Sequence, residues 1–333
     1  PMLEEIDHAH GMYLHTRDGK QIMDLISGIG VSALGHTHPA VVKAVQDQVA
    51  RYMHTMVYGE FVLGPQVQLA TRLTALLPEH LNSVYFVNSG AEAVEGAMKL
   101  ARKVTGKQKM VACTRSYHGS TQGTMSLQSE PYFTQPYRPL LPGIRFIRFN
   151  HPEDLMAIDE RTAGVVMETV QAEIGLQVPH DQYLQKVADR CREVGAMLIL
   201  DEIQAAFGRT GQLFAFNHFG VVPDILLLAK GMGGGMPIGA FIAAKDHMDT
   251  LSKDPVLGHI TTFGGHPVNC AAGLATLETL TTSDLINHVP FKAALFRQHL
   301  THPAIKEVRQ CGLWFALELE DEATLMRAVS LGL

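Results

Sequence analysis

Short apolar runs alternate with helical patterns through the middle of the chain. Runs of this kind, rich in valine, isoleucine, leucine and phenylalanine, are typical of strands that are buried on both faces. The predicted strands are Ser83–Asn88, Met110–Thr114, Ile144–Phe149, Gly164–Glu168, Ala196–Asp201, Asp224–Lys230 and Ile238–Ala244. Such a set predicts one extended sheet in the centre of the protein.

Helical periodicity separates several of these runs. Ala91–Lys103 follows the first run, and Gln182–Val194 has one apolar stripe that ends at Gly195, a residue that commonly terminates helices. Strands that alternate with helices favour a mostly parallel α/β sheet with helices on both faces.

The segments on either side of this region have a different pattern. Before it we expect a hairpin over Met12–Asp24 and helices near Pro39–Met53 and Pro65–Leu77. After it we expect a helix at Cys270–Leu280 and a strand pair at Ile305–Arg309 and Leu313–Leu319. We therefore predict an N-terminal segment (1–38) that packs with a small domain, a large domain (39–246), and a linker with a partial C-terminal small domain (247–333).

The last residues predict a helix over Glu322–Leu333 that has no following partner element, and the first residue is Pro1 rather than methionine. From this we expect the small α/β domain to be truncated.

Composition narrows the classes of function. The 333 residues are 46% hydrophobic and 18% charged, which indicates a folded core rather than disorder. The net charge of −6 and the lack of a long basic run argue against nucleic acid as a partner. No apolar run has the length of a membrane span. Four scattered cysteines without a CxxC pair indicate neither a disulfide framework nor a metal site, and we expect a cytoplasmic protein.

Polar residues follow several of the predicted strands. The turn Ser89-Gly90-Ala91-Glu92 follows the first strand, and Glu168, Asp201 and Lys230 end three others. Ligands of open parallel sheets bind at the carboxyl ends of the strands. We therefore expect these groups to share one crevice.

Each group also has a structural interpretation when it is taken alone. Ser89 and Glu92 have the spacing of a capping box, so they predict an ordinary helix start as readily as a phosphate site. Asp201 at a buried strand end could form an ion pair, bind a metal, or accept from a pyridinium N–H. Lys230 at such an end would have a lowered pKa and a nucleophilic amine.

The glycines after Lys230 do not form a nucleotide-binding motif. The sequence Gly231-Met232-Gly233-Gly234-Gly235 matches neither GxGxxG nor the P-loop order, because the lysine precedes the glycines. His36 and His38 have a metal-like spacing, but without acids or cysteines nearby they indicate a structural loop.

Five motifs in order resemble the class III aminotransferases, which are pyridoxal phosphate (PLP) enzymes of fold type I that include the ornithine, acetylornithine and 4-aminobutyrate enzymes. The matching segments are Asn88–Ala93, Tyr117–Gly119, Asp201–Gln204 with Phe207–Gly211, Leu228–Gly235 and Thr261–Gly265. The resemblance covers essentially the whole chain. It implies a mostly parallel seven-stranded sheet with helices on both faces, plus a smaller α/β domain.

The resemblance also implies how the cofactor is held. Lys230 corresponds to the lysine that forms the Schiff base with PLP and then moves a proton, and Asp201 corresponds to the partner of the pyridine nitrogen. Ser89, Gly90 and Ala91 correspond to the phosphate cup.

Further residues surround the cofactor in this comparison. Tyr117 corresponds to the aromatic residue that stacks on the ring, Gln204 to the residue near the 3′-oxygen, and Glu168 to the acid that supports this layer. His118 is a possible neighbour of the cofactor. Thr262 resembles the threonine that reaches the phosphate in the neighbouring subunit, which implies a homodimer with its sites at the interface.

Two features concern the substrate. Glu173 resembles the glutamate that pairs with an arginine and gates it in ornithine-type members, and we expect that arginine beyond residue 333. The ornithine and acetylornithine enzymes carry an arginine directly after the aromatic-x-Gly unit, whereas this chain has Ser120. A hydroxyl cannot form a bidentate salt bridge, so a different donor pose is expected.

The sequence therefore predicts a PLP-dependent aminotransferase with a ping-pong cycle, in which a donor with an ω-amino group or an amino-acid donor passes its amino group to a 2-oxo acid. The alternatives are an aminomutase, racemase or decarboxylase on the same scaffold, because substrate orientation decides which bond reacts. A nucleotide-binding α/β protein without PLP is a further alternative.

Overall fold

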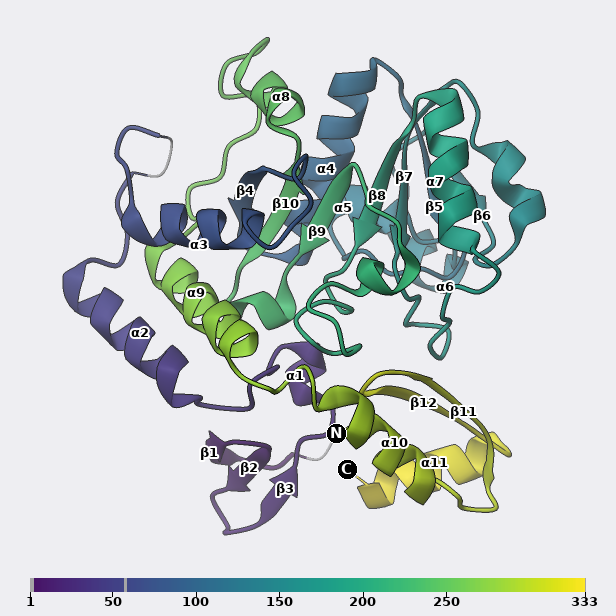
Figure 1. Cartoon of the computed structure of the whole chain (residues 1–333). Helices are drawn as coiled ribbons and strands as arrows, with labels where there is room; N and C mark the ends of the chain where they lie inside the picture. Colours follow the sequence, from purple (N-terminus) through teal and green to yellow (C-terminus); the bar gives the residue numbers. More distant parts are fainter. Residues whose placement is uncertain (1–2, 57–58, 333) are drawn as a thin grey trace.

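The core of the protein is a seven-stranded sheet with helices on both faces, seen in a computed structural model that describes residues 3–56 and 59–332 (Figure 1). The strand order is β4-β10-β9-β8-β7-β5-β6. The strands are β4 (Ser83–Val87), β5 (Lys109–Cys113), β6 (Ile144–Ile147), β7 (Thr162–Glu168), β8 (Met197–Asp201), β9 (Ile225–Leu228) and β10 (Gly239–Ala243). Every strand predicted for this region is present, with ends shifted by one or two residues, and the prediction of the fold class is confirmed.

The sheet is parallel except at β10, which is antiparallel to both β4 and β9. β9 and β10 are neighbours in sequence and in the sheet, and they are joined by a short glycine-rich connection that contains η4 (Lys230–Gly233). A parallel pair needs a long crossover, whereas a short connection can only join antiparallel neighbours.

Alternate residues of each strand face different helices. In β8, Leu198 and Leu200 belong to the core shared with α7 (Tyr183–Val194), whereas Met197 and Ile199 belong to the core shared with α4 (Gly90–Thr105). Side chains of successive strand residues point to opposite faces, so a continuous apolar run buries both faces of the sheet.

The remaining helices and strands surround this sheet. α2 (Pro39–Arg51), α3 (Gly64–Thr74) and α9 (Pro267–Thr282) pack together beside it. A small sheet of β1 (Ile6–His10), β2 (Tyr13–Thr16) and β3 (Gln21–Met23) and a second unit of α10 (Val289–His299), β11 (Ile305–Cys311), β12 (Trp314–Leu319) and α11 (Glu322–Gly332) lie below the large sheet in Figure 1. The short elements are α1 (Ser27–Gly30), α5 (Gln122–Met125), α6 (Pro131–Thr134), η1 (Gln135–Tyr137), η2 (Pro152–Ala157), η3 (Ala215–Phe219), α8 (Lys245–Met248) and η5 (Asp249–Ser252). The domain boundaries given above stay a prediction.

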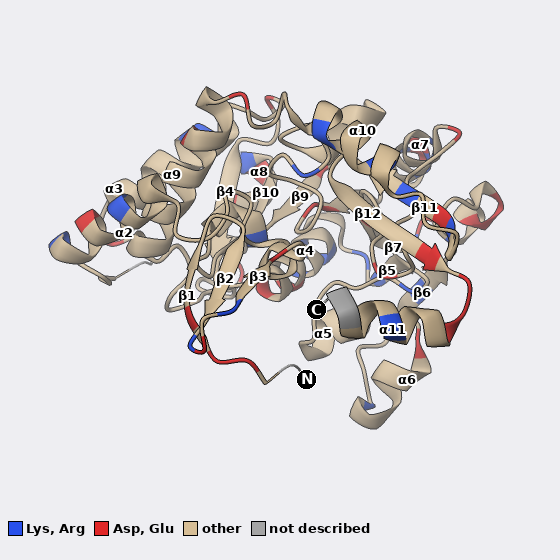
Figure 2. Ribbon diagram, turned by 90° about the horizontal axis from the view of Figure 1, so that it is seen from below, with Lys and Arg blue, Asp and Glu red and all other residues tan. Residues whose placement is uncertain are grey.

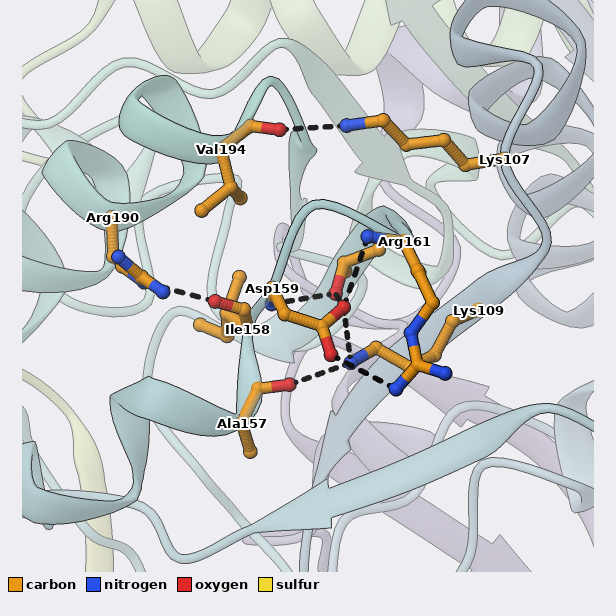
Figure 3. Close-up of polar contacts among 9 residues, drawn as sticks. Lys107, Lys109, Ala157, Ile158, Asp159, Arg161, Arg190 and Val194 are labelled. Carbon is orange, nitrogen blue, oxygen red and sulfur yellow. Dashed lines mark hydrogen bonds and ion pairs between the residues drawn. The ribbon is translucent and has the colours of Figure 1, made fainter.

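Polar contacts join the amino end of β5 to the turn between η2 and β7 (Figure 3). The Lys109 Nζ lies 2.7 Å from an Asp159 carboxylate oxygen and donates to the Ala157 carbonyl at 2.8 Å. Arg190 of α7 donates to the Ile158 carbonyl at 2.9 Å. The hydrogen bond from Lys109 lowers the pKa of Asp159. These contacts satisfy the backbone at the edge opposite the predicted crevice.

Charged residues of both signs are interspersed over the ribbon seen from below, without a basic stripe (Figure 2). Within residues 3–56 and 59–332, no helix combines the length and the apolar character needed to span a membrane. The His36 Nε2 lies 2.8 Å from an Asp24 carboxylate oxygen, so this histidine has a structural partner. In the same described residues, no group of three or more histidine, cysteine or acidic residues could hold a metal ion.

Gly96 sets how closely α4 approaches the sheet. A Cβ added at Gly96 would overlap the ring of Phe241 in β10. That ring is fully buried and stacks on Tyr85 with the centroids 4.9 Å apart, so it has little room to move. We predict that Gly96→Ala lowers the free energy of unfolding by about 1–3 kcal/mol through overpacking, measured by urea denaturation.

Gly64→Ala is the matched control, because a Cβ at Gly64 would meet nothing within 4 Å. This variant should stay within about 0.5 kcal/mol of the wild type or gain stability slightly. An equal loss in both variants would contradict the packing explanation.

Candidate active site

A cavity of about 470 Å³ opens at the carboxyl edge of the sheet, a volume within the range of small-molecule sites. Nine residues predicted from the sequence line it together, and they come from five separate segments. They are Ser89, Gly90, Ala91, Tyr117, His118, Glu168, Asp201, Gln204 and Lys230.

The sheet register explains why these residues meet. Glu168 and Asp201 are paired neighbours at the ends of the parallel strands β7 and β8. Ser89 follows β4, and Lys230 follows β9 by one residue. Because parallel strands end at one edge of a sheet, residues far apart in the sequence converge there.

Lys230 lies two residues beyond the end of β9. The prediction that the strand runs to Lys230 is wrong, because β9 ends at Leu228 and Lys230 opens η4 with a left-handed φ of 45°. The Met232 N–H donates to the Ala229 carbonyl, which draws the backbone out of the strand. Burial lowers the pKa of Lys230. Among the described residues, its amine has no hydrogen bond or ion pair.

Asp201 and His118 form a buried pair. The His118 Nδ1 lies 2.7 Å from the Asp201 Oδ2, and the Ile203 N–H donates to the Oδ1 at 3.0 Å. Burial alone would lower the pKa of His118, but the hydrogen bond and charge of Asp201 raise it above its ordinary value. The His118 Nε2 is buried and has no partner among the described residues. This direct contact is a feature that sequence reasoning missed, because the two residues are distant in the chain.

Glu168 holds the wall beside this pair. Its carboxylate accepts from the backbone N–H of Tyr117 at 3.2 Å and of Ala172 at 2.9 Å. Burial raises the pKa of Glu168 to about 7. The acid therefore fixes the backbone of Tyr117, a residue that is 41% exposed and lines the cavity.

The turn at Ser89 begins α4. The Ser89 side chain accepts from the Glu92 N–H at 3.2 Å, as a capping box requires. The Glu92 carboxylate reaches back to the Asn88 N–H at 2.7 Å, one residue before the cap. Gly90 and Ala91 line the cavity at the positive end of a 16-residue helix. Such a helix start favours a bound phosphate.

Glu173 and Gln204 lie between this cavity and a neighbouring one. The neighbouring cavity measures about 780 Å³ and shares Tyr117 and Ser120 with the first, and Glu173 lines it. The Gln204 amide lies 3.5 Å from a Glu173 carboxylate oxygen. The Ser120 hydroxyl lies 3.2 Å from the Tyr117 hydroxyl.

Thr262 does not line the cavity. It is exposed, while the adjacent Thr261 accepts from the Asn88 amide at 3.0 Å. Thr262 therefore lies near the end of β4, but it is not part of the cavity that the other predicted residues of the same chain line.

Glu202 is a second residue that sequence reasoning did not single out. It is fully buried and accepts from the Thr169 hydroxyl and from the backbone N–H groups of Ala215 and Phe216. Burial raises the pKa of Glu202 to about 7. In the sequence, only the position of Glu202 beside Asp201 points to this residue. An acid at a strand end does not indicate which backbone N–H groups will donate to it.

The chemistry of these residues fits pyridoxal phosphate. The cavity offers an amine with a lowered pKa, an ionisable acid–histidine pair, an aromatic ring and a helix N-terminus. These groups match an aldehyde, a pyridine nitrogen, a planar ring and a phosphate. Among the described residues, the buried His118 Nε2 has no partner, so it is a group that a polar ligand could satisfy.

Comparison with known proteins gives one consistent picture. The family model described as "Aminotransferase class-III" matches residues 1–333. The acetylornithine aminotransferase of Methanopyrus kandleri is 41% identical over 319 residues, which cover 94% of this chain and 80% of the relative. The putrescine aminotransferase of Pectobacterium atrosepticum is 39% identical, over 90% of this chain and 67% of the relative.

A solved structure shares the fold over the whole chain. The ornithine aminotransferase from Toxoplasma gondii superimposes with a TM-score of 0.91 at 30% identity, covering 100% of this chain and 82% of that one. These two relatives and this solved structure are all aminotransferases, yet their names give three different substrates.

The buried acids predict a pH dependence of stability. Glu168 and Glu202 have pKa values raised from 4.5 to about 7, so the folded chain binds their protons more tightly than the unfolded chain. Stability that is full below about pH 4.5 should fall as the pH rises to about 7, by on the order of 3 kcal/mol for each group. Urea denaturation of the chain without added cofactor, from pH 4.5 to 8, measures this change.

Glu168→Gln should reduce this fall, because it removes one of the two titrating acids. The exposed Glu160 provides the control, and Glu160→Gln should keep the wild-type profile. A profile in Glu168→Gln as steep as that of the wild type would refute the assignment.

Proposed function

Because the chain belongs to the class-III aminotransferase family, we propose that its cavity holds pyridoxal phosphate and that the residues predicted from the sequence move an amino group from an amine or amino-acid donor to a 2-oxo acid. PLP-dependent transamination is the activity of this family, and the chain is an aminotransferase. The roles of the individual residues are the proposal.

One observation carries the proposal: Lys230, Asp201 and the Ser89-Gly90 turn line the same cavity although they belong to three different strand ends. An amine alone, an acid alone or a helix start alone has an ordinary structural explanation. Their convergence around a volume suited to a small molecule is the arrangement that PLP requires.

Pyridoxal phosphate supplies an aldehyde that takes up the amino group and a ring that withdraws electrons when its nitrogen is protonated. Lys230 provides the amine that binds the aldehyde, and its lowered pKa makes the free amine a base for the proton on the donor carbon. Asp201 would accept a hydrogen bond from the ring nitrogen, and Glu168 and Gln204 line the same cavity beside it.

His118 positions Asp201 rather than reacting itself. Its Nδ1 contacts the carboxylate of Asp201, and the raised pKa of His118 favours an imidazolium that donates to this carboxylate and fixes its orientation. Tyr117 covers the ring, and the N–H groups at Gly90 and Ala91 bind the phosphate.

The donor is held by the adjoining cavity. Arg115, Ser120 and Glu173 line it, and Ser120 stands at the position where the ornithine-type enzymes have an arginine. We therefore favour a donor that is not anchored by a bidentate salt bridge at that position. The printed names of the relatives include both an acylated amino acid and a diamine as substrates of those proteins.

Covalent labelling with PLP tests the role of Lys230. In the wild type, borohydride reduction should fix PLP to a single tryptic peptide containing Lys230, and mass spectrometry detects the added mass. Lys230→Ala should lose this mass and lower kcat by about three orders of magnitude or more.

The exposed Lys186 is the matched control, and Lys186→Ala should keep both the label and the activity. A label on another lysine, or a wild type that takes up no PLP, would end the proposal.

We also propose a homodimer in which Thr262 reaches the phosphate site of the neighbouring subunit. Support comes from its exposure, its absence from the cavity of its own chain, and the exposed apolar residues around it, which include Leu257, Ile260 and Phe263. Exposed apolar groups of this kind favour an interface. A cytoplasmic location stays a prediction from the cysteine usage.

Mixing two defective variants tests whether Thr262 acts in the site of the neighbouring subunit. Heterodimers of Lys230→Ala and Thr262→Ala would contain one doubly defective site and one intact site, so an equal mixture should recover about one quarter of the wild-type sites. PLP retention after dialysis and activity both measure this recovery. If Thr262 acts within its own chain, mixing recovers nothing.

A further inference from the structure

Arg209 is a half-buried cation to which the proposed reaction assigns no role. Its Nε donates to the Gln204 carbonyl at 2.8 Å, and the ring of Trp314 lies 5.4 Å from the guanidinium carbon. Among the described residues, neither terminal nitrogen has a hydrogen-bond partner and no carboxylate pairs with the guanidinium. Burial lowers the pKa of Arg209. A buried charge without a counter-charge is costly unless something compensates it.

A cavity of about 170 Å³ adjoins this guanidinium. Arg209 and Lys292 line it, together with the side chains or backbone of Ser27 and Ser32, and its lining contains no aspartate or glutamate. The two cations come from different parts of the fold, since Arg209 follows β8 and Lys292 belongs to α10. The cavity therefore has positive charge on two walls and no fixed negative charge.

Gly30 provides the space for the guanidinium. A Cβ at Gly30 would lie 2.5 Å from the Arg209 Nη2, and Gly30 has a φ of 75° that side chains rarely adopt. The backbone of the N-terminal segment therefore packs against Arg209. The remaining N–H donors of the guanidinium are then available to the cavity.

We propose that this cavity binds a small oxyanion, a carboxylate or a phosphate group, between Arg209 and Lys292. A guanidinium matches two oxygens of such a group with two parallel hydrogen bonds, and an ammonium adds a point charge. The volume admits inorganic phosphate or a short carboxylate, whereas larger ligands occupy sites of about 300–1,000 Å³. The site is lined by other residues than the cavity at Lys230. Its effect on Lys230 rests on the proposed function, whereas anion binding itself does not.

An anion bound in this cavity would change the pKa of the Lys230 amine. Gly231 lines the same cavity and follows Lys230 directly. Burial is the main cause of the lowered pKa of Lys230, and the charge of Arg209 contributes in the same direction. A bound anion would offset that charge and so raise the pKa of the lysine.

The experiment measures thermal unfolding of the PLP-loaded enzyme in increasing inorganic phosphate, with ionic strength held constant by sodium HEPES. PLP occupies the helix start at Ser89, so added phosphate cannot act there. A saturable rise in Tm is expected, as for any ligand that binds only the folded state. A parallel titration with acetate identifies whether carboxylates bind as well, and saturation by either anion supports the site.

The variants separate this site from general salt effects, which also raise Tm but do not saturate. Lys292→Met should raise the half-saturating phosphate concentration about tenfold without changing Tm in the absence of phosphate, because Lys292 is exposed. Lys186→Met, on the exposed side of α7, should respond as the wild type does. Arg209→Met should abolish the saturable response if it folds, and Lys292→Met decides the question if it does not.

A second readout concerns Lys230. Saturating phosphate should move the pH midpoint of the visible absorption of the loaded enzyme upward in the wild type and not in Lys292→Met. An unsaturable Tm response to both anions, or identical titrations for the wild type and Lys292→Met, would overturn the proposal.

Discussion

The removal of charged groups from water at one edge of the sheet is the constraint on which this structure depends. Asp201 ends a strand whose other residues are apolar and buried, so its carboxylate needs partners, and the Ile203 N–H and His118 provide them. Among the described residues, the amine of Lys230 has no such partner, and burial lowers its pKa. The buried acid is thus held by hydrogen bonds, while the buried amine loses its proton more readily.

The same constraint organises the loops around the edge. Glu168 fixes the backbone at Tyr117, and Glu202 fixes the segment at Ala215 and Phe216 through N–H groups that the loops could not otherwise satisfy. Each acid ties a neighbouring segment to the end of its own strand. The rigid sheet therefore positions flexible connections through buried carboxylates, which is how residues from five segments reach one cavity.

The proposed oxyanion site at Arg209 would also join neighbouring segments through a charged group, here a cation instead of a carboxylate. Its guanidinium contacts the carbonyl of Gln204, the ring of Trp314 and the space beside Gly30, so it joins the edge of the large sheet to the N-terminal segment and to β12. A cation in this place links parts of the molecule that border the amine at Lys230. Occupation of the adjoining cavity would then adjust the electrostatics of the site without contacting the substrate.

The sequence by itself determined the strands of the large sheet, the approximate limits of α2, α3, α4, α7 and α9, and the identity of the residues at the strand ends. It could do so because apolar runs, glycine stops and a capping serine act over a few residues, and because the motifs keep their order along the chain. Only the tertiary structure decided that β10 runs antiparallel, that Lys230 leaves the strand in a left-handed turn, and that His118 contacts Asp201. These features depend on backbone direction and on contacts between residues distant in the chain, which no local pattern encodes.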